Sequence, residues 1–147
     1  MHQEYTVSNF YKFLRLNNID EIKIKLKKKL DGLDIKGSFL IGNEGVNGSF
    51  SVKTEYLKKT ISIINNVFDK KFRFKSQFYH SHVFLRLKIK IKKEIVTIGK
   101  KSVQPSSVSG QHLSPEEWEE IINYKDVIVI DTRNHYESSI GSFSSSI

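Results

Sequence analysis

Patterns typical of strands and of helices follow one another along residues 5–93 in a single order. Five stretches read as strands, because they are rich in β-branched and aromatic residues or alternate in polarity: Tyr5–Arg15, Ile35–Ile41, Val46–Val52, Phe72–Tyr79 and Phe84–Lys93. One helical pattern separates the first two strands and another separates the third from the fourth. The order βαββαβ predicts an α+β, ferredoxin-like sandwich with both helices on one face of a sheet and the other face wet. Phe84–Lys93 then adds a fifth strand, which Glu94–Ile98 could extend.

Helix caps support the first of the two helical patterns. Ile22, Leu26 and Leu30 repeat at helical spacing. Asn18 and Glu21 fit an N-terminal cap, and Gly32 stands where a C-terminal cap belongs. The lysines here also alternate in part, which leaves a strand as the alternative, but the caps favour a helix. The second helix is indicated by the apolar residues Leu57, Ile61, Ile64 and Phe68.

The segment GNEG, Gly42–Gly45, joins the second and third strands. We expect a hairpin with a loop of about four residues, in which both glycines suit positive φ. Glycine-rich turns can also expose backbone N–H groups to an anion. The sequence has neither G-x-G-x-x-G nor a Walker lysine, so the hairpin is the favoured interpretation.

Phe84–Lys93, FLRLKIKIKK, alternates apolar and cationic residues. Because successive side chains of a strand point to opposite faces, the stretch predicts one apolar and one cationic face. The cations would stand about 6.6 Å apart, close to the spacing of phosphates along a nucleic acid. The alternative is that lysines on an exposed strand prevent edge-to-edge aggregation. Four aromatic residues could stack bases on an exposed sheet face: Tyr5, Phe10, Tyr11 and Tyr79.

Charge changes sign along the chain. Residues 1–103 hold 22 Lys and Arg against 9 Asp and Glu, a net +13, whereas residues 104–147 hold 2 against 7, a net −5. The reversal indicates two units with different roles, and the strongly positive one favours a polyanionic partner. Compositional drift towards lysine is the alternative, but it does not explain why the last 44 residues escape it.

Several classes of site find no support in the sequence. The chain has no cysteine, which excludes disulfides and thiol nucleophiles within it. No apolar run approaches the length of a membrane span and no signal-peptide pattern begins the chain, so we expect a cytoplasmic protein without membrane contact. His80 and His82 could begin a metal site, but no third ligand is evident, and we expect them to end a strand at the surface. We expect no metal and no cofactor.

Residues beyond 98 divide into a linker and the start of a second domain. Residues 99–112 are rich in Gly, Ser, Lys and Pro, which is typical of a linker. Ser114, Pro115 and Glu117 then predict a helix N-terminus, with the helix running to about Ile122. Val127–Asp131, VIVID, is typical of a parallel strand buried on both faces. We therefore expect domains at 1–98 and 113–147.

Three motifs in this order resemble one family. GNEGVNGS, KKEIVTIG and IDTRNHYE are similar to segments of the bacterial rhodanese-domain-containing tRNA uridine hydroxylases, which place a 5-hydroxyl on the wobble uridine. The resemblance covers about residues 9–147. It implies a ferredoxin-like (acylphosphatase-like) N-terminal domain followed by a rhodanese-like α/β domain that carries a catalytic cysteine.

The chain departs from that family in two respects. It has no cysteine, so the resemblance assigns no catalytic residue to it and leaves open whether it is an enzyme. Residues 113–147 supply only the first elements of a rhodanese fold, and we expect them to pack poorly alone. The remainder would belong to a separate or continuing chain.

The resemblance and the charge pattern together select the candidate residues. The family motifs include Glu44, Asn47, Asp131, Arg133 and Glu137, of which the last three would hold a strand-to-helix turn by charge-assisted hydrogen bonds. The expected contacts to tRNA phosphates are Lys12, Arg15, Arg86, Lys88, Lys90 and Lys93.

Three functional hypotheses follow from these residues. The first is tRNA wobble-uridine hydroxylation, with this chain supplying the RNA-docking domain. The second is a non-catalytic module whose sheet edge pairs with a protein partner or a second copy. The third, an acylphosphatase-like enzyme using Arg15 and Asn47, lacks the phosphate-loop sequence that should precede the arginine.

Overall fold

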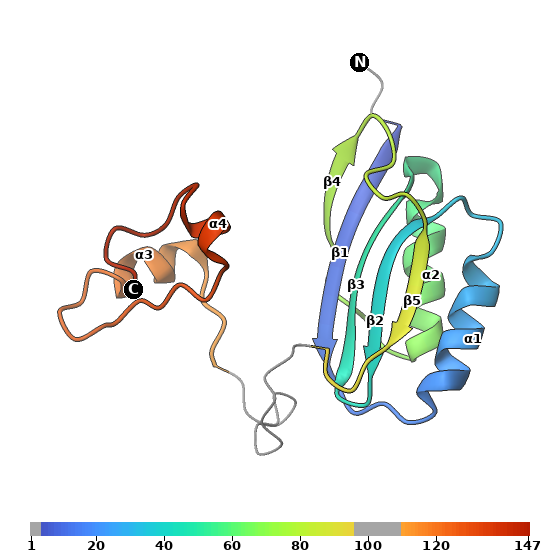
Figure 1. The fold of residues 1–147 in the computed structure, drawn as a ribbon, viewed down its shortest axis with the longest axis horizontal. Coiled ribbons are helices and arrows are strands. Elements are labelled where there is room, and N and C mark those ends of the chain that lie inside the picture. Colours follow the sequence, from blue (N-terminus) through green and yellow to red (C-terminus); the bar gives the residue numbers. More distant parts are fainter. Residues whose placement is uncertain (1–3, 96–109) are drawn as a thin grey trace. The chain divides into compact units, whose positions relative to one another are not determined.

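The computed structural model describes residues 4–95 and 110–147. The chain forms two compact units, residues 1–109 and 110–147 (Figure 1). Most of the expected linker, residues 99–112, lies outside the described residues, as do residues 96–98 of the expected extension of the fifth strand.

The first unit is the predicted α+β sandwich. Its five strands are β1 (Tyr5–Phe13), β2 (Lys36–Gly42), β3 (Gly45–Lys53), β4 (Lys75–Tyr79) and β5 (Leu87–Ile91). They form one sheet in the order β4-β1-β3-β2-β5, antiparallel except that β5 runs parallel to β2. The first four strands thus have the order and directions of the ferredoxin-like fold, which confirms the predicted fold class, and β5 adds an edge.

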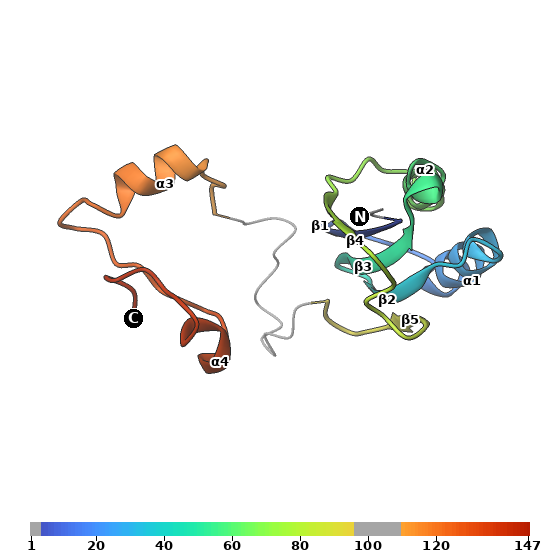
Figure 2. The ribbon, with the colours of Figure 1, turned by 90° about the horizontal axis from the view of Figure 1, so that it is seen from above.

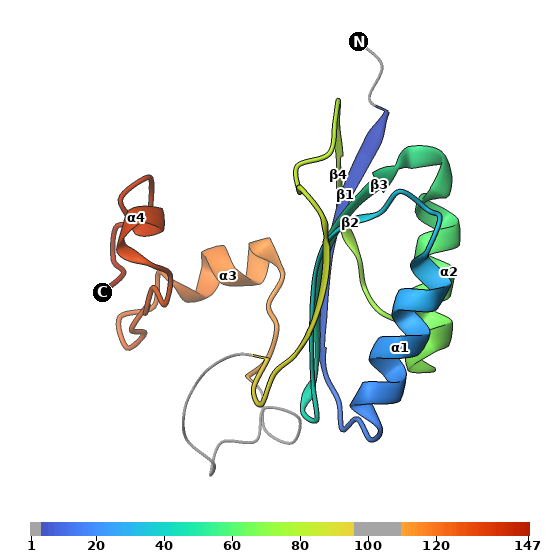
Figure 3. The same cartoon turned by 45° about the vertical axis from the view of Figure 1, so that its right-hand side comes forward.

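Both long helices lie on the same face of this sheet. They are α1 (Ile19–Leu30) and α2 (Leu57–Phe68), the latter entered through a short 3-10 turn at Thr54–Tyr56. Figures 2 and 3 show the two helices side by side on one side of the strands. The opposite face of the sheet carries no helix of this unit, as the βαββαβ order predicts.

Apolar residues of alternate parity fill the space between helices and sheet. Val46, Phe50 and Val52 of β3 are fully buried, and Leu26, Leu30 and Ile64 meet them from the helices. Phe10 of β1 is only 2% exposed and packs against Phe39, Phe72 and Phe74, with ring centroids 4.9–5.8 Å apart. The expectation that Phe10 stacks bases is therefore wrong, because its ring is in the core.

Helix α1 forms where predicted, but its start is built differently. Asn18 occupies the cap position in the left-handed region, with φ 54°, and its side chain makes no capping hydrogen bond. The C-terminal expectation holds: Gly32 follows the cap residue Asp31 with φ 77°, a backbone conformation that glycine adopts without a Cβ penalty.

The β2–β3 hairpin is tighter than predicted. Gly42 pairs directly with Gly45, so the loop holds two residues, Asn43 and Glu44, rather than four. Only Gly45 of the two glycines has positive φ, at 149°. A Cβ at Gly45 would collide with the backbone oxygen of Lys12, which is the reason this position needs glycine.

The alternating stretch around β5 is shorter than its sequence pattern. Leu85 is 96% exposed and precedes the strand, so the alternation does not extend to it. Glu94 and Ile95 are not in a strand either. The ladder to β2 does reach one residue beyond each end, since Gly37 N donates to Arg86 O and Lys92 N donates to Ile41 O.

The second unit has two short helices, α3 (Pro115–Ile121) and α4 (His135–Ser138). The cap predicted for α3 is confirmed: Glu117 N donates to Ser114 Oγ, and Ser114 N donates to the Glu117 carboxylate. The buried strand predicted at Val127–Asp131 is not present. Val129 forms an isolated bridge to Ser146, while Ile128 and Ile130 are 75% and 66% exposed. Within residues 110–147 no further strand lies beside this segment to cover Ile128 and Ile130.

Candidate nucleic-acid interface

The face of the sheet that the helices leave uncovered is defined here as the open face. The register identifies its residues: because Phe10, Gly48 and Phe39 lie in one cross-strand row inside the core, residues of the other parity face outward. One such row crosses all five strands, in the order Lys75, Asn9, Ser49, Ser38 and Lys88. With strands about 4.8 Å apart, its two terminal lysines stand roughly 19 Å apart at their Cα atoms.

The open face is cationic. Its strand positions hold five lysines and, among the strand residues that the structure describes, no Asp or Glu; the lysines are Lys36, Lys53, Lys75, Lys88 and Lys90. Only Lys53 makes an ion pair with a described residue: its Nζ lies 3.5 Å from Glu4 Oε1, and this contact raises the pKa of Lys53. None of the other four lysines has an Asp or Glu oxygen of residues 4–95 or 110–147 within 4.0 Å of its Nζ, so no described carboxylate forms an ion pair with it.

Tyrosines interleave with these lysines. Tyr11, which is 57% exposed, shares a row with Asn47, Leu40 and Lys90. Tyr79 and Tyr5 pair across β4 and β1. Tyr79 is 39% exposed, whereas the ring of Tyr5 packs against His82 with centroids 4.5 Å apart. Tyr11 and Tyr79 thus offer aromatic surface to a ligand on the open face.

Two of the six predicted phosphate contacts lie on the open face itself. Lys88 and Lys90 project from β5 to this face, because Leu87 and Ile89 project to the helix side. Arg86 and Lys93 are exposed in the segments that flank β5. Arg15 is exposed in the loop that follows β1.

Lys12 lies on the opposite side of the sheet. It pairs with Val46, which is fully buried under the helices, and its Nζ donates a hydrogen bond to Lys71 O at 3.3 Å. Lys12 and Lys88 therefore cannot contact one phosphate backbone that runs along the open face.

The connection from β4 to β5 crosses the open face, because these two strands form opposite edges of the sheet (Figure 3). His82 fixes this crossing. Its Nδ1 lies 2.7 Å from Ser51 Oγ and its Nε2 lies 3.3 Å from Asp34 Oδ2. The second contact is a close approach rather than an aligned hydrogen bond, since Nε2 is buried without a hydrogen-bond partner. The expectation of a surface position is wrong for His82, whose side chain is 9% exposed.

His82 lies between Ser51 and Asp34, as the histidine of a Ser–His–Asp triad lies between its serine and its aspartate. A nucleophilic serine must be reached by a substrate, but Ser51 is fully buried beneath the crossing segment. The three residues therefore anchor the crossing segment and are not arranged for acyl transfer.

The GNEG turn also has a structural role. A carboxylate oxygen of Glu44 accepts a hydrogen bond of 2.6 Å from Ile95 N. Backbone bonds from Leu14 N to Glu44 O and from Leu16 N to Asn43 O hold the turn against the end of β1. Asn47 lies on the open face in β3, and no hydrogen bond joins it to Arg15 or to any other described side chain.

In the second unit the three motif residues stabilise one turn. Arg133 donates from Nε to Asp131 Oδ1 at 2.9 Å, from Nη2 to Asp131 Oδ2 at 2.6 Å, and from Nη2 to Gly141 O at 2.7 Å. The guanidinium lowers the pKa of Asp131 to about 2. Glu137 accepts from Asn134 N at 3.0 Å, which caps α4.

The described residues hold neither a metal-binding cluster nor a helix that could span a membrane. No cluster of three or more His, Asp or Glu side chains in residues 4–95 and 110–147 has the geometry to hold a metal ion. Over the same ranges, no helix has both the length and the apolar character needed to cross a bilayer.

Sequence reasoning missed three open-face lysines, Lys36, Lys53 and Lys75. Each stands next to a core residue or at a strand end, so none belongs to a run of alternating charges. The available signal was parity: Lys36 must face away from Phe39 if Phe39 is in the core.

The fold and this face define an acylphosphatase-like α+β sandwich with a cationic, partly aromatic open sheet surface. The family described as UPF0176 acylphosphatase like domain matches residues 5–95, and the chain belongs to this family.

Curated relatives extend the similarity over nearly the whole chain. A protein of Legionella pneumophila (strain Paris) named tRNA uridine(34) hydroxylase is 35% identical over 148 residues, covering 99% of this chain and 58% of the relative. A protein of the same name from Prochlorococcus marinus (strain MIT 9515) is 36% identical, covering 97% of this chain and 47% of the relative. The chain thus spans about half the length of the relatives it matches.

Proposed function

We propose that the open face docks tRNA for the hydroxylation of uridine 34, the reaction named for the relatives. Two supports converge: the relatives are tRNA-modifying enzymes by name, and the open face gathers four lysines that form no ion pair with a described carboxylate, together with exposed tyrosines, on one surface. Such work on tRNA would take place in the cytoplasm. The observation that carries the proposal is the row that begins at Lys75 and ends at Lys88 without an acidic residue.

The proposal divides the work between the two units. Residues 1–98 would supply docking and residues 113–147 the start of a rhodanese-like domain, joined by a linker at 99–112. Because the chain has no cysteine, we assign it no catalytic residue. Hydroxylation would then need the part of the longer relatives that this chain does not match.

Docking through lysines predicts that the affinity for tRNA depends steeply on salt concentration. Each phosphate neutralised by a lysine releases counterions, so four contacts should reduce affinity roughly 50–150-fold between about 50 and 200 mM salt. A fluorescence titration of labelled tRNA with the full chain at these two concentrations measures this. Binding that ignores salt, or no binding at the lower concentration, contradicts the proposal.

A matched pair of double variants locates the site. Lys88→Glu with Lys90→Glu reverses two charges on the open face, and Lys58→Glu with Lys59→Glu reverses two exposed charges on α2. Both pairs change the net charge equally. We expect the first pair to weaken tRNA binding more than tenfold and the second no more than about threefold. Equal losses would contradict docking on the open face.

A further inference from the structure

The outer side of β5 combines a free strand edge with an apolar groove. We propose that it binds an extended polypeptide segment in which acidic and apolar residues alternate. This proposal does not depend on RNA binding, although the two ligands would share Lys88 and Lys90.

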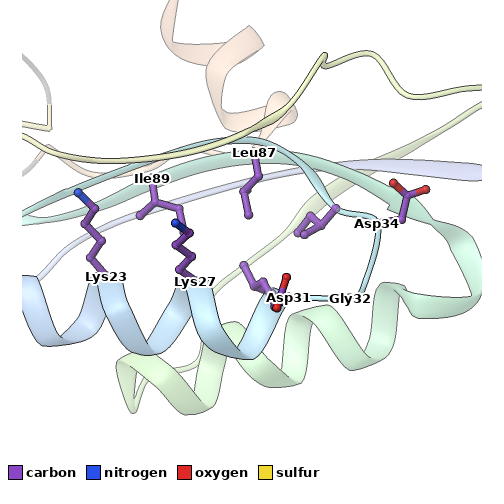
Figure 4. A pocket seen from close by; sticks show the side chains of 9 residues that line it. Lys23, Lys27, Asp31, Gly32, Asp34, Leu87 and Ile89 are labelled. Atoms are coloured by element: carbon purple, nitrogen blue, oxygen red, sulfur yellow. The ribbon is translucent and has the colours of Figure 1, made fainter.

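The groove lies between β5 and α1 and has a volume of about 520 Å³. Leu87 and Ile89 point from β5 towards α1, and Lys23 and Lys27 rise from α1 towards Ile89 (Figure 4). Leu30 and Ile35 complete the apolar lining, while Asp31 and Asp34 stand towards the other end. The volume is within the range of sites that bury ligand groups, and the lining suits apolar side chains.

The backbone of β5 offers hydrogen bonds on the same side. Arg86 O and Lys92 N bond to β2, and since the backbone groups of a strand alternate in direction, those of Lys88 and Lys90 also face β2. The N–H and C=O groups of Leu87, Ile89 and Ile91 therefore point outward. Because β5 is last in the strand order, no described strand pairs with them. Such an edge is a template for an added strand.

Charge selects among the possible occupants. Lys88 and Lys90 flank the edge on the open face, and Lys23 and Lys27 flank it on the helix side. A second copy of β5 would bring the same lysines opposite one another, which is unfavourable. An RNA strand could neutralise them but has no ladder of alternating donors and acceptors for the outward groups of Ile89. An acidic peptide strand satisfies both requirements.

The two faces fix the pattern of the peptide. Its acidic residues would lie beside Lys88 and Lys90, and its apolar residues would enter the groove against Leu87 and Ile89. Asp31 and Asp34 disfavour a carboxylate on the groove side at the Leu87 end. Alternation therefore follows from the two-residue period of a strand.

The probe is the capped peptide Glu-Ile-Glu-Ile-Glu-Ile-Glu, titrated into the full chain at low salt and followed by amide NMR. We expect chemical-shift changes and slowed hydrogen exchange at Leu87, Ile89 and Ile91. Replacing the three isoleucines by serine, or the four glutamates by lysine, should weaken binding at least tenfold. Changes confined to other elements, or equal binding of all three peptides, would overturn the proposal.

Two isomeric N-methylated peptides test strand pairing directly. Methylation of the first two isoleucine amides and methylation of the two central glutamate amides block opposite edges of the peptide with the same number of methyl groups, so we expect one isomer to keep binding within about threefold and the other to lose it at least tenfold. Equal behaviour of the isomers contradicts an added strand.

A protein variant provides the complementary test. Ile89→Pro removes an outward N–H without removing a bond to β2, and Ile89→Ala removes the same apolar contact but keeps the N–H. We expect Ile89→Pro to bind at least fivefold more weakly than Ile89→Ala. Equal affinities of the two variants would overturn the pairing. The pairing would also be overturned if an RNA oligonucleotide, but not the peptide, slowed hydrogen exchange at the amides of Leu87, Ile89 and Ile91.

Discussion

Ser51 Oγ and His82 Nδ1 lie 2.7 Å apart although 31 residues separate them in the chain. The contact joins the third strand of the sheet to the segment that carries the chain across the open face to β5. Lys88 and Lys90 follow this segment, but the ladder between β5 and β2 holds them in place. The anchor and the proposed docking lysines are therefore different residues, and stability and binding can be tested by separate mutations.

We predict that His82→Ala lowers the free energy of unfolding by about 1–3 kcal/mol, because it leaves the buried Ser51 hydroxyl without its partner and removes the ring packed against Tyr5. Urea denaturation measures the change. Ser81→Ala, an exposed neighbour in the same segment, is the control and should change stability by less than about 0.5 kcal/mol. Similar values for both variants would show that His82 is not an anchor.

A second prediction distinguishes the two sides of the sheet. Lys75→Gln removes a charge from the open face, and Lys12→Gln removes the same charge from the helix side. The slope of log affinity against log salt is negative. If tRNA docks on the open face, Lys75→Gln should reduce the magnitude of this slope by about 0.7–0.9, whereas Lys12→Gln should leave it unchanged. The slopes come from titrations at four or more salt concentrations. A larger effect at Lys12 would move the interface to the helix side.

The strand and helix order was predictable from the sequence because each element carries its own period. Which aromatic residue faces the core was not. Phe10 and Tyr11 are adjacent in β1, and Phe10 is inside because Gly48 opposite leaves space for its ring: a Cβ at Gly48 would lie 2.5 Å from Phe10 Cε1. The fit between Phe10 and Gly48 can be recognised only when the pairing register of β1 and β3 is known.

Other features depend on contacts between distant segments. The burial of His82 involves Ser51 of β3 and Asp34 of the loop between α1 and β2, and nothing in the local sequence around His80 and His82 distinguishes these two histidines. Val127–Asp131 shows the opposite case. Its composition is typical of a buried strand, but burial needs neighbouring strands that the described residues 110–147 do not supply.

The hairpin that holds the family motif gives a third prediction. Gly45→Ala should destabilise the first unit by more than about 1 kcal/mol, because alanine disfavours positive φ and its Cβ would collide with Lys12 O. Gly32→Asn is the control. Gly32 also has positive φ, but the space around its Cα is open and asparagine tolerates this backbone conformation. Thermal unfolding of both variants measures the difference. Equal destabilisation would show that the collision at Gly45 is relieved at little cost.

The last prediction concerns the turn in the second unit. Arg133 lowers the pKa of Asp131 to about 2 from an ordinary value of 3.8. A carboxyl group whose pKa is depressed by folding stabilises the folded form above its unfolded pKa, and this contribution is lost as the pH falls through the folded value. The contribution of the Asp131–Arg133 pair to stability should therefore be fully present above about pH 4 and lost between about pH 4 and 2, and the pair itself should open around pH 2. The ¹³C shift of the Asp131 carboxyl reports the titration directly, with a midpoint expected near 2.

Arg133→Gln removes the guanidinium and should return the midpoint towards 3.8, whereas Arg133→Lys, which keeps the charge but not the paired hydrogen bonds, should give an intermediate value. A midpoint near 3.8 in the unmodified chain would show that the pair does not hold this turn in solution.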